Sequence, residues 1–72
     1  MNVEEIKKFL EERLVEVERK YRSRIERFGS DNKKSLMSMS ASYELEYLYE
    51  NLFGKDEFEK LMEENFPEDF ED

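Results

Sequence analysis

The stretch that decides the fold is residues 2–29, NVEEIKKFLEERLVEVERKYRSRIERFG. Its apolar residues recur every three or four positions and fall within about 100° of a helical wheel, the width of a core-facing stripe. Asn2 is a good N-cap residue, and Glu5 stands three residues later in the reciprocal capping arrangement. Gly29 stands where a glycine commonly ends a helix. The stretch predicts a helix over about residues 3–28, with an apolar stripe of Val3, Ile6, Leu10, Leu14, Val17, Tyr21, Ile25 and Phe28.

A second helix is predicted over about residues 35–53. The segment before it, GSDNKK at 29–34, is a turn by composition, and Gly54 stands where the helix would end. Between Met37 and Leu45 apolar and small polar residues alternate as in a strand, but no second strand exists to pair with them. We expect the side of this helix that packs on the first to carry Met37, Ala41, Leu45, Leu48 and Leu52.

A short third helix is predicted over about residues 57–66. Asp56 can cap it, with Glu59 in the capping-box position. Pro67 forbids its continuation. Its apolar residues follow a helical period and are Phe58, Leu61, Met62 and Phe66.

Short turns make consecutive helices antiparallel neighbours. The predicted fold class is therefore all-α: an antiparallel helical hairpin closed by the short third helix, associating into a dimeric helical bundle. We expect the third helix to lie on the N-terminal end of the first, where it would cover Phe9 and meet Lys7 and Lys8 with its carboxylates. Residues 1–66 would form one helical domain, and residues 67–72 an acidic C-terminal tail.

The composition removes most catalytic chemistry. The 72 residues include no cysteine and no histidine, which excludes disulfides, thiolate metal sites and the commonest general base. The serines have no histidine to activate them, and there is no glycine-rich phosphate loop. Acids spaced three apart, as metal-dependent helical enzymes use, occur only at Asp56/Glu59, Glu68/Glu71 and Asp69/Asp72. We expect no enzyme activity, no metal and no cofactor.

The chain is 44% charged, with a formal net charge of −8. No apolar run approaches the ~18 residues of a membrane span, and the N-terminus lacks the apolar region of a signal peptide. We expect a soluble, cytoplasmic protein that makes no membrane contact.

The charges are distributed unevenly along the chain. Residues 19–34 hold seven cations and two carboxylates, whereas residues 56–72 hold nine carboxylates and one cation. The basic pole at 19–34 suits a helix C-terminus, an acidic partner or nucleic acid. Its arginines spread around the helical wheel and the whole chain is acidic, which weakens the nucleic-acid interpretation.

Apolar side chains left over from the predicted packing indicate a partner-binding surface. On the second helix they include tyrosines, which are enriched at interfaces, and a methionine, which suits adaptable ones. In the tail, phenylalanines among carboxylates are typical of a segment that docks into a basic, apolar groove. The predicted partner-binding residues are Leu36, Met39, Tyr43, Tyr47, Phe66 and Phe70.

The sequence therefore favours a non-enzymatic protein-interaction module: a small acidic helical regulator or inhibitor that binds a protein partner of basic character. It would also associate with itself, as a homodimer or higher oligomer. By size and charge alone, it is comparable with phage-encoded inhibitors of nucleic-acid-binding host proteins. Two alternatives stay open. One is a nucleic-acid-binding protein that uses the basic pole, and the other is a structural oligomer component.

Overall fold

The computed structural model describes residues 1–71, and residue 72 of the predicted tail lies outside them. The chain forms four elements in order: α1 (Val3–Phe28), α2 (Lys33–Phe53), α3 (Lys55–Asn65) and a one-turn 3-10 helix, η1 (Pro67–Phe70). No strand occurs in residues 1–71, which confirms the all-α prediction. None of these helices is both long and apolar enough to cross a bilayer.

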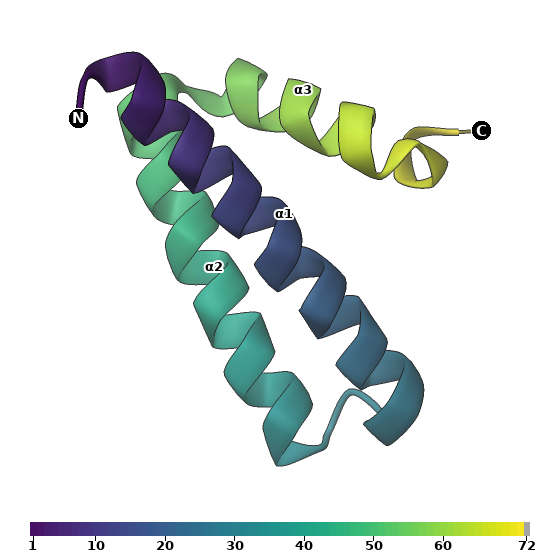
Figure 1. Ribbon diagram of the computed structural model, residues 1–72. Coiled ribbons are helices and arrows are strands. Elements are labelled where there is room, and N and C mark those ends of the chain that lie inside the picture. The colour runs from purple at the N-terminus through teal and green to yellow at the C-terminus, as the bar shows by residue number, and fades with distance from the viewer. Residues whose placement is uncertain (72) are drawn as a thin grey trace.

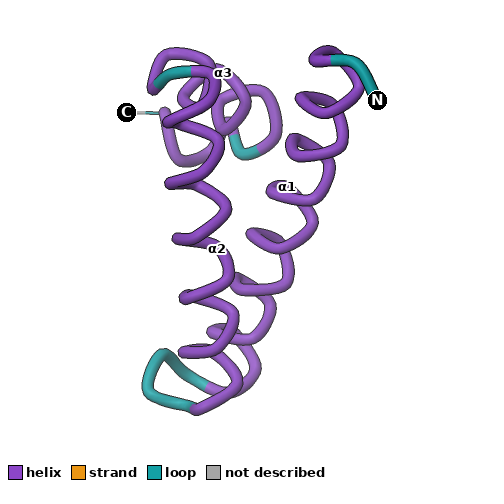
Figure 2. Tube along the Cα trace, turned by 90° about the vertical axis from the view of Figure 1, so that its left-hand side faces the viewer, coloured by secondary structure: helices purple, strands orange, loops and turns teal. Residues whose placement is uncertain are grey.

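Figure 1 shows α1 and α2 side by side and running in opposite directions. The orthogonal view in Figure 2 shows that their axes cross at an angle. α3 runs across this pair at the end where α1 begins and α2 ends (Figure 1). The three helices meet on that side, and the buried cluster between them reaches Leu14 in the middle of α1.

The two ends of α1 lie where the sequence predicts them. The Asn2 side chain accepts a hydrogen bond of 2.8 Å from the backbone N–H of Glu5. At the other end, Gly29 donates its N–H to the carbonyl of Ile25 over 2.8 Å and has a φ of 85°, which favours glycine.

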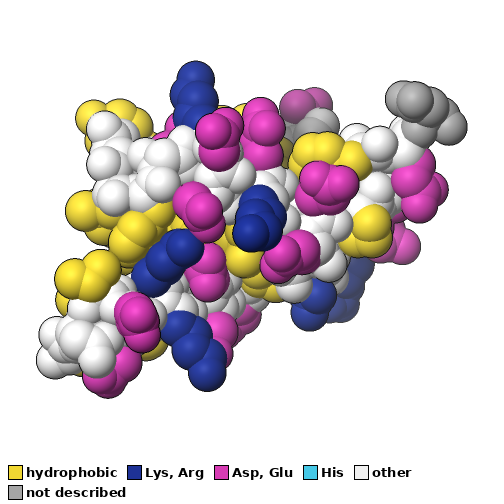
Figure 3. Space-filling view, turned by 90° about the horizontal axis from the view of Figure 1, so that it is seen from above, with side chains coloured by type: hydrophobic (Ala, Val, Ile, Leu, Met, Phe, Trp, Pro, Cys, Tyr) yellow, Lys and Arg dark blue, Asp and Glu magenta, His cyan; other side chains and the backbone are white. Residues whose placement is uncertain are grey.

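The predicted apolar stripe of α1 is buried only in its middle. Leu14 and Val17 are buried, whereas Val3 and Ile6 are exposed. Viewed from the end at which α1 begins (Figure 3), hydrophobic side chains lie open to solvent beside interleaved charges. The other helices therefore cover the middle of the stripe and leave its first members, Val3 and Ile6, open to solvent.

The observed starts of α2 and α3 differ from the predicted ones by two residues. α2 begins at Lys33 because the Asn32 side chain, predicted as part of a turn, accepts a hydrogen bond of 2.9 Å from the N–H of Lys34. α3 begins directly after Gly54, and no side chain caps it, so the prediction that Asp56 caps this helix is wrong.

The seam between α1 and α2 is built largely from serines. Ser35, Ser38 and Ser42 are the buried polar residues of α2, and with Leu45 and Tyr49 they recur at spacings of three and four. Small side chains at these positions let the two backbones approach closely. The predicted core side of α2 is wrong except for Leu45, because four of its five members are exposed: Met37, Ala41, Leu48 and Leu52.

Each buried serine has a hydrogen-bond partner outside its own helix. The Ser35 hydroxyl donates to the Gly29 carbonyl at 2.7 Å, and the Ser42 hydroxyl donates to Glu18 of α1 at 2.7 Å. Arg24 of α1 donates to the Ser38 hydroxyl at 2.8 Å. These hydrogen bonds compensate the loss of water around the buried hydroxyls. They also fix which residues of α1 and α2 lie opposite one another.

The core lies where α3 meets the pair. Tyr49 of α2 is fully buried, with its ring centroid 5.1 Å from that of Phe53 and 6.5 Å from that of Phe58 in α3. The other buried members of this cluster come from α1, α3 and the residue after α3: Leu14, Leu61, Met62 and Phe66.

The contacts of α3 with the first turns of α1 match the prediction in part. Lys7 Nζ lies 2.9 Å from Glu57 Oε2, which confirms an ion pair between these helices. Phe9, expected to pack under α3, is 57% exposed, so that expectation is wrong. At 100° per residue Phe9 projects about 160° away from Lys7, and one helix does not cover both.

Candidate functional site

Most of the predicted partner-binding residues of α2 face away from the serine seam. Tyr43 and Tyr47 are 57% and 69% exposed, and Leu36 is also exposed, whereas Met39 is half-buried. These exposed residues belong to a stripe with the same heptad-like spacing as the seam, on the opposite side of the helix. We call this stripe the outer strip; its members are Lys33, Leu36, Ser40, Tyr43, Tyr47 and Glu50.

Carboxylates border the tyrosine end of the outer strip. Tyr43 and Tyr47 line a shallow hollow of about 330 Å³ together with Glu46 and Glu50. Partial burial raises the pKa of Glu46, and the neighbouring charge of Glu50 raises that pKa further. The rings therefore lie beside a carboxylate whose charged form is disfavoured.

The two predicted tail residues lie in different environments. Phe66 is 4% exposed and belongs to the core, whereas Phe70 in η1 is exposed. The prediction that Phe66 serves as an exposed docking anchor is therefore not supported. Phe66 continues the apolar stripe of α3, and this position directs its ring into the core. Phe66 and Phe70 therefore do not form one surface.

Arg22 of α1 holds the C-terminal segment in place, a role the sequence analysis missed. Its guanidinium carbon lies 4.2 Å from the centroid of the Phe66 ring. Its two terminal nitrogens pair with the Asp69 carboxylate, and one of them lies 3.7 Å from Glu68 Oε1. It also bonds Glu18 on its own helix at 3.1 Å. The hydrogen bond from Arg22 lowers the pKa of Asp69. The sequence offered only a general indication of this contact, because the middle of the chain is cationic and its end is acidic.

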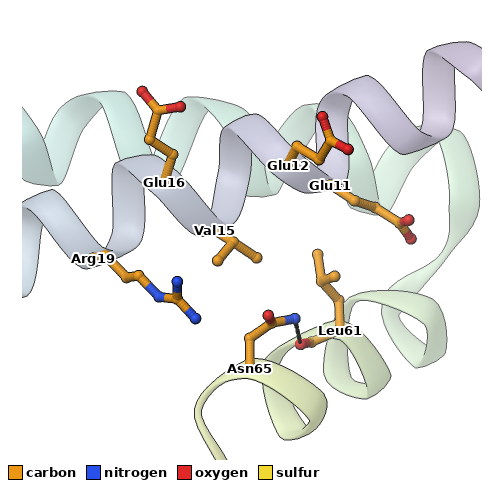
Figure 4. Close-up of a pocket in the computed structure, with 7 residues that line it drawn as sticks. All are labelled: Glu11, Glu12, Val15, Glu16, Arg19, Leu61 and Asn65. Atoms are coloured by element: carbon orange, nitrogen blue, oxygen red, sulfur yellow. Dashed lines mark hydrogen bonds between the residues drawn. The ribbon is translucent and has the colours of Figure 1, made fainter.

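A hollow of about 410 Å³ lies between α1 and α3. Figure 4 shows Val15, Leu61 and Arg19 directed into it, while Glu12 and Glu16 point away. Its interior is therefore mostly apolar, with one guanidinium at its edge. Across residues 1–71 no three carboxylates converge in a way that would hold a metal ion.

The arginines of the basic pole do not all lie on one face of α1. Arg22 points to the C-terminal segment, and Arg19 lies 5.7 Å from the Phe66 ring. Arg24 points to the α2 side, where it donates to the carbonyl of Lys34 at 3.2 Å as well as to Ser38. The arginines therefore divide between two sides of α1, as their spread on the helical wheel predicts.

No known protein family, no curated protein and no solved structure matches this chain.

Proposed function

We propose that this protein is a non-enzymatic interaction module that associates with a second copy of itself through the outer strip of α2. The polarity of α2 carries the proposal. Its buried side is mainly serine, whereas Leu36, Tyr43 and Tyr47 are left in water on the other side. Full burial of one such large apolar side chain is worth ~1.5–3 kcal/mol, so covering the strip would stabilise a small fold appreciably.

An antiparallel pair of α2 helices brings complementary residues together. With a twofold axis between Ala41 and Ser42, each Leu36 would share a layer with Tyr47 of the second copy, because core positions of antiparallel coiled helices pair in this way. Tyr43 would meet the small side chain of Ser40, which leaves space for the ring.

Charge supports the same register. Lys33 and Glu50 stand at the two ends of the outer strip and would share a layer across the interface, once at each end of the symmetric pair. A parallel arrangement would instead bring Lys33 near Lys33 and Glu50 near Glu50, which is repulsive. The antiparallel register is favoured for this reason.

Sedimentation equilibrium over a wide concentration range tests the proposal. Replacing Tyr43 and Tyr47 with lysine should dissociate the oligomer while circular dichroism shows unchanged helix content. Phe9→Lys is the matched control, because Phe9 is an equally exposed aromatic residue on α1. A wild-type protein that stays monomeric at tens of micromolar refutes self-association.

A charge exchange tests the register itself. Lys33→Glu should weaken the dimer, Glu50→Lys should weaken it as well, and the two substitutions together should restore it. Failure of the double variant to recover would reject the antiparallel register even where the tyrosine variants dissociate.

A further inference from the structure

A second surface lies between α1 and α2, on the face away from α3. Two hollows adjoin there, of about 360 Å³ near the turn and about 160 Å³ nearer the middle of the pair. Both are lined by Lys20 and Arg24, so they lie side by side and together make up a depression along α1 and α2. Val17 at its floor projects about 160° from Val15, which faces α3, so the depression and α3 occupy opposite sides of α1. We call it the basic groove.

The wall of the basic groove nearest the turn is cationic and is not neutralised. No carboxylate of residues 1–71 forms a salt bridge with Lys20, Arg24, Arg27 or Lys34. The hydrogen bonds of Arg24 to Ser38 and to a backbone carbonyl fix its guanidinium without removing its charge.

Phe28 helps to concentrate these cations. Lys34 Nζ lies 4.8 Å and Arg27 Cζ 5.3 Å from the centroid of its ring. Four positive charges are thus held close together in a protein of net charge −8.

The opposite wall of the basic groove is apolar. Met37 on α2 is 60% exposed and lines the groove with Ala41, while Val17 of α1 is buried beneath them. Leu48 and Leu52 are exposed along the same side of α2, at helical spacing from Ala41. An occupant of this groove therefore meets cations on one side and a line of aliphatic side chains on the other.

We propose that the basic groove binds an acidic amphipathic helix of a partner protein. Its apolar stripe would pack on Met37 and Ala41, and its carboxylates would face the cations of α1. From Arg13 to Arg27 the groove follows α1 for about 21 Å, which matches roughly four turns of a bound helix. Because the outer strip lies on another side of α2, this inference is independent of self-association.

Two other occupants fit the groove less well. The acidic end of a second copy is already engaged, since Glu68 and Asp69 contact Arg22 of their own chain. A nucleic acid would gain little from the aliphatic wall, and the net charge of the protein would repel a long polyanion.

Fluorescence anisotropy with a labelled peptide tests this proposal. The probe is a helix of about 16 residues, long enough to span the groove, with leucines at positions i, i+3, i+4 and i+7 and glutamates elsewhere. The comparison peptide has the same composition in an order that destroys the stripe. We expect saturable binding of the first to the full chain, at least about 10-fold tighter than that of the second, and weakening as salt is added.

Matched variants locate the site. Lys20→Glu with Arg27→Glu should weaken binding about 10-fold or more, and Met37→Gln should weaken it several-fold. Lys8→Glu with Lys60→Glu makes the same change in net charge away from the groove and should leave affinity unchanged. Circular dichroism melts verify that each variant is folded.

Equal affinity for the two peptides would overturn the proposal. Undiminished affinity in the Lys20 and Arg27 double variant would do so too, as would tighter binding of a single-stranded oligonucleotide than of the peptide at equal salt. Loss of peptide binding in the Tyr43 and Tyr47 variant would place the contact on the outer strip and also reject the groove. Absence of peptide binding in a protein that still dimerises refutes the groove alone.

Discussion

The phenolic oxygen of Tyr49 in α2 donates a hydrogen bond to Glu11 in α1 over 2.6 Å, and the Tyr49 side chain is completely buried. Burial raises the pKa of Tyr49, and the carboxylate of Glu11 raises it further. The phenol therefore remains a neutral donor, and the bond joins the two long helices at the level where α3 covers them.

Removing this hydroxyl should cost stability without disturbing the ring packing. Tyr49→Phe leaves the half-buried carboxylate of Glu11 without its donor, and hydrogen bonds to charged groups contribute about 1.5–3 kcal/mol. Urea denaturation should show a loss in this range, whereas Tyr49→Ala should cost about 3–5 kcal/mol and leave little folded protein. A Tyr49→Phe variant as stable as the wild type would show that the hydrogen bond contributes nothing.

Enlarging the seam should be worse than removing its hydroxyls. Ser42→Ala forfeits one hydrogen bond to the carboxylate of Glu18 and should cost about 1.5–3 kcal/mol. Ser42→Leu must also push α1 and α2 apart, with an overpacking cost of about 1–3 kcal/mol or more. Ser40→Leu, on the exposed side of the same helix, is the control and should be nearly neutral at low protein concentration. Equal stability of the two leucine variants would contradict the close approach at Ser42.

The contact between Arg22 and Asp69 should make stability depend on pH in the acid range. The pKa of Asp69 is lowered from its usual 3.8 in the folded protein, so its contribution is present above that value and is lost as pH falls through the lowered pKa. Asp69→Asn should be less stable than the wild type at pH 7, and the difference should shrink towards zero in strong acid. Guanidinium denaturation at several pH values measures this, and a difference that does not change with pH would reject the ion pair as its source.

Glu46 should show the opposite behaviour. Its pKa is raised from 4.5, because burial and the charge of Glu50 disfavour the carboxylate, so its ionisation above the raised pKa destabilises the fold. Glu46→Gln should therefore raise the melting temperature at pH 7, with the gain vanishing once the pH falls below 4.5. Glu44→Gln serves as control on an exposed position of the same helix. A melting temperature lower than that of the wild type at pH 7 would contradict this account.

Two truncations separate the stability contributed by the buried Phe66 ring from that contributed by the ion pairs of Arg22 with Glu68 and Asp69. Ending the chain after Phe66 removes η1 with Glu68 and Asp69, the two acidic partners of Arg22 beyond Phe66. It should cost little because exposed ion pairs are individually weak. Ending it after Asn65 also removes a buried ring worth about 1.5–3 kcal/mol, a large share of the stability of so small a core. Similar urea midpoints for the two truncated chains would show that Phe66 contributes no more than the residues after it.

The elements predicted correctly are those specified by local signals. α1 could be predicted to the residue because Asn2 and Gly29 act on the backbone of their own helix. The buried side of α2 could not be predicted from hydrophobicity, because Ser38 and Ser42 are buried by partners supplied from α1. The 3-4 spacing of the serines with Tyr49 was the available signal, and it was obscured by a second stripe of larger residues with the same spacing.

One part of the candidate surfaces could likewise be predicted from the sequence, and another part could not. Exposure of Tyr43 and Tyr47 follows from their position on a helix whose other side is covered, and this exposure could be predicted from the sequence. The basic groove depends on how α1 and α2 pack, and therefore on the serine seam. Since that seam was missed, Met37 was assigned to the core when it lies open beside Lys20.

A single residue, Gly54, joins α2 to α3, and its φ of 97° turns the chain back on itself. Any residue with a side chain would be strained at that angle, although there is open space around it. With helical dihedrals at this position, residues 33–65 would form one rod, and α3 could reach only the α1 of a neighbouring chain. The contacts of Lys7 with Glu57 and of Arg22 with Asp69 would then re-form between molecules, giving a domain-swapped dimer. The backbone conformation of this one residue thus separates a third helix that completes its own chain from one that would complete another.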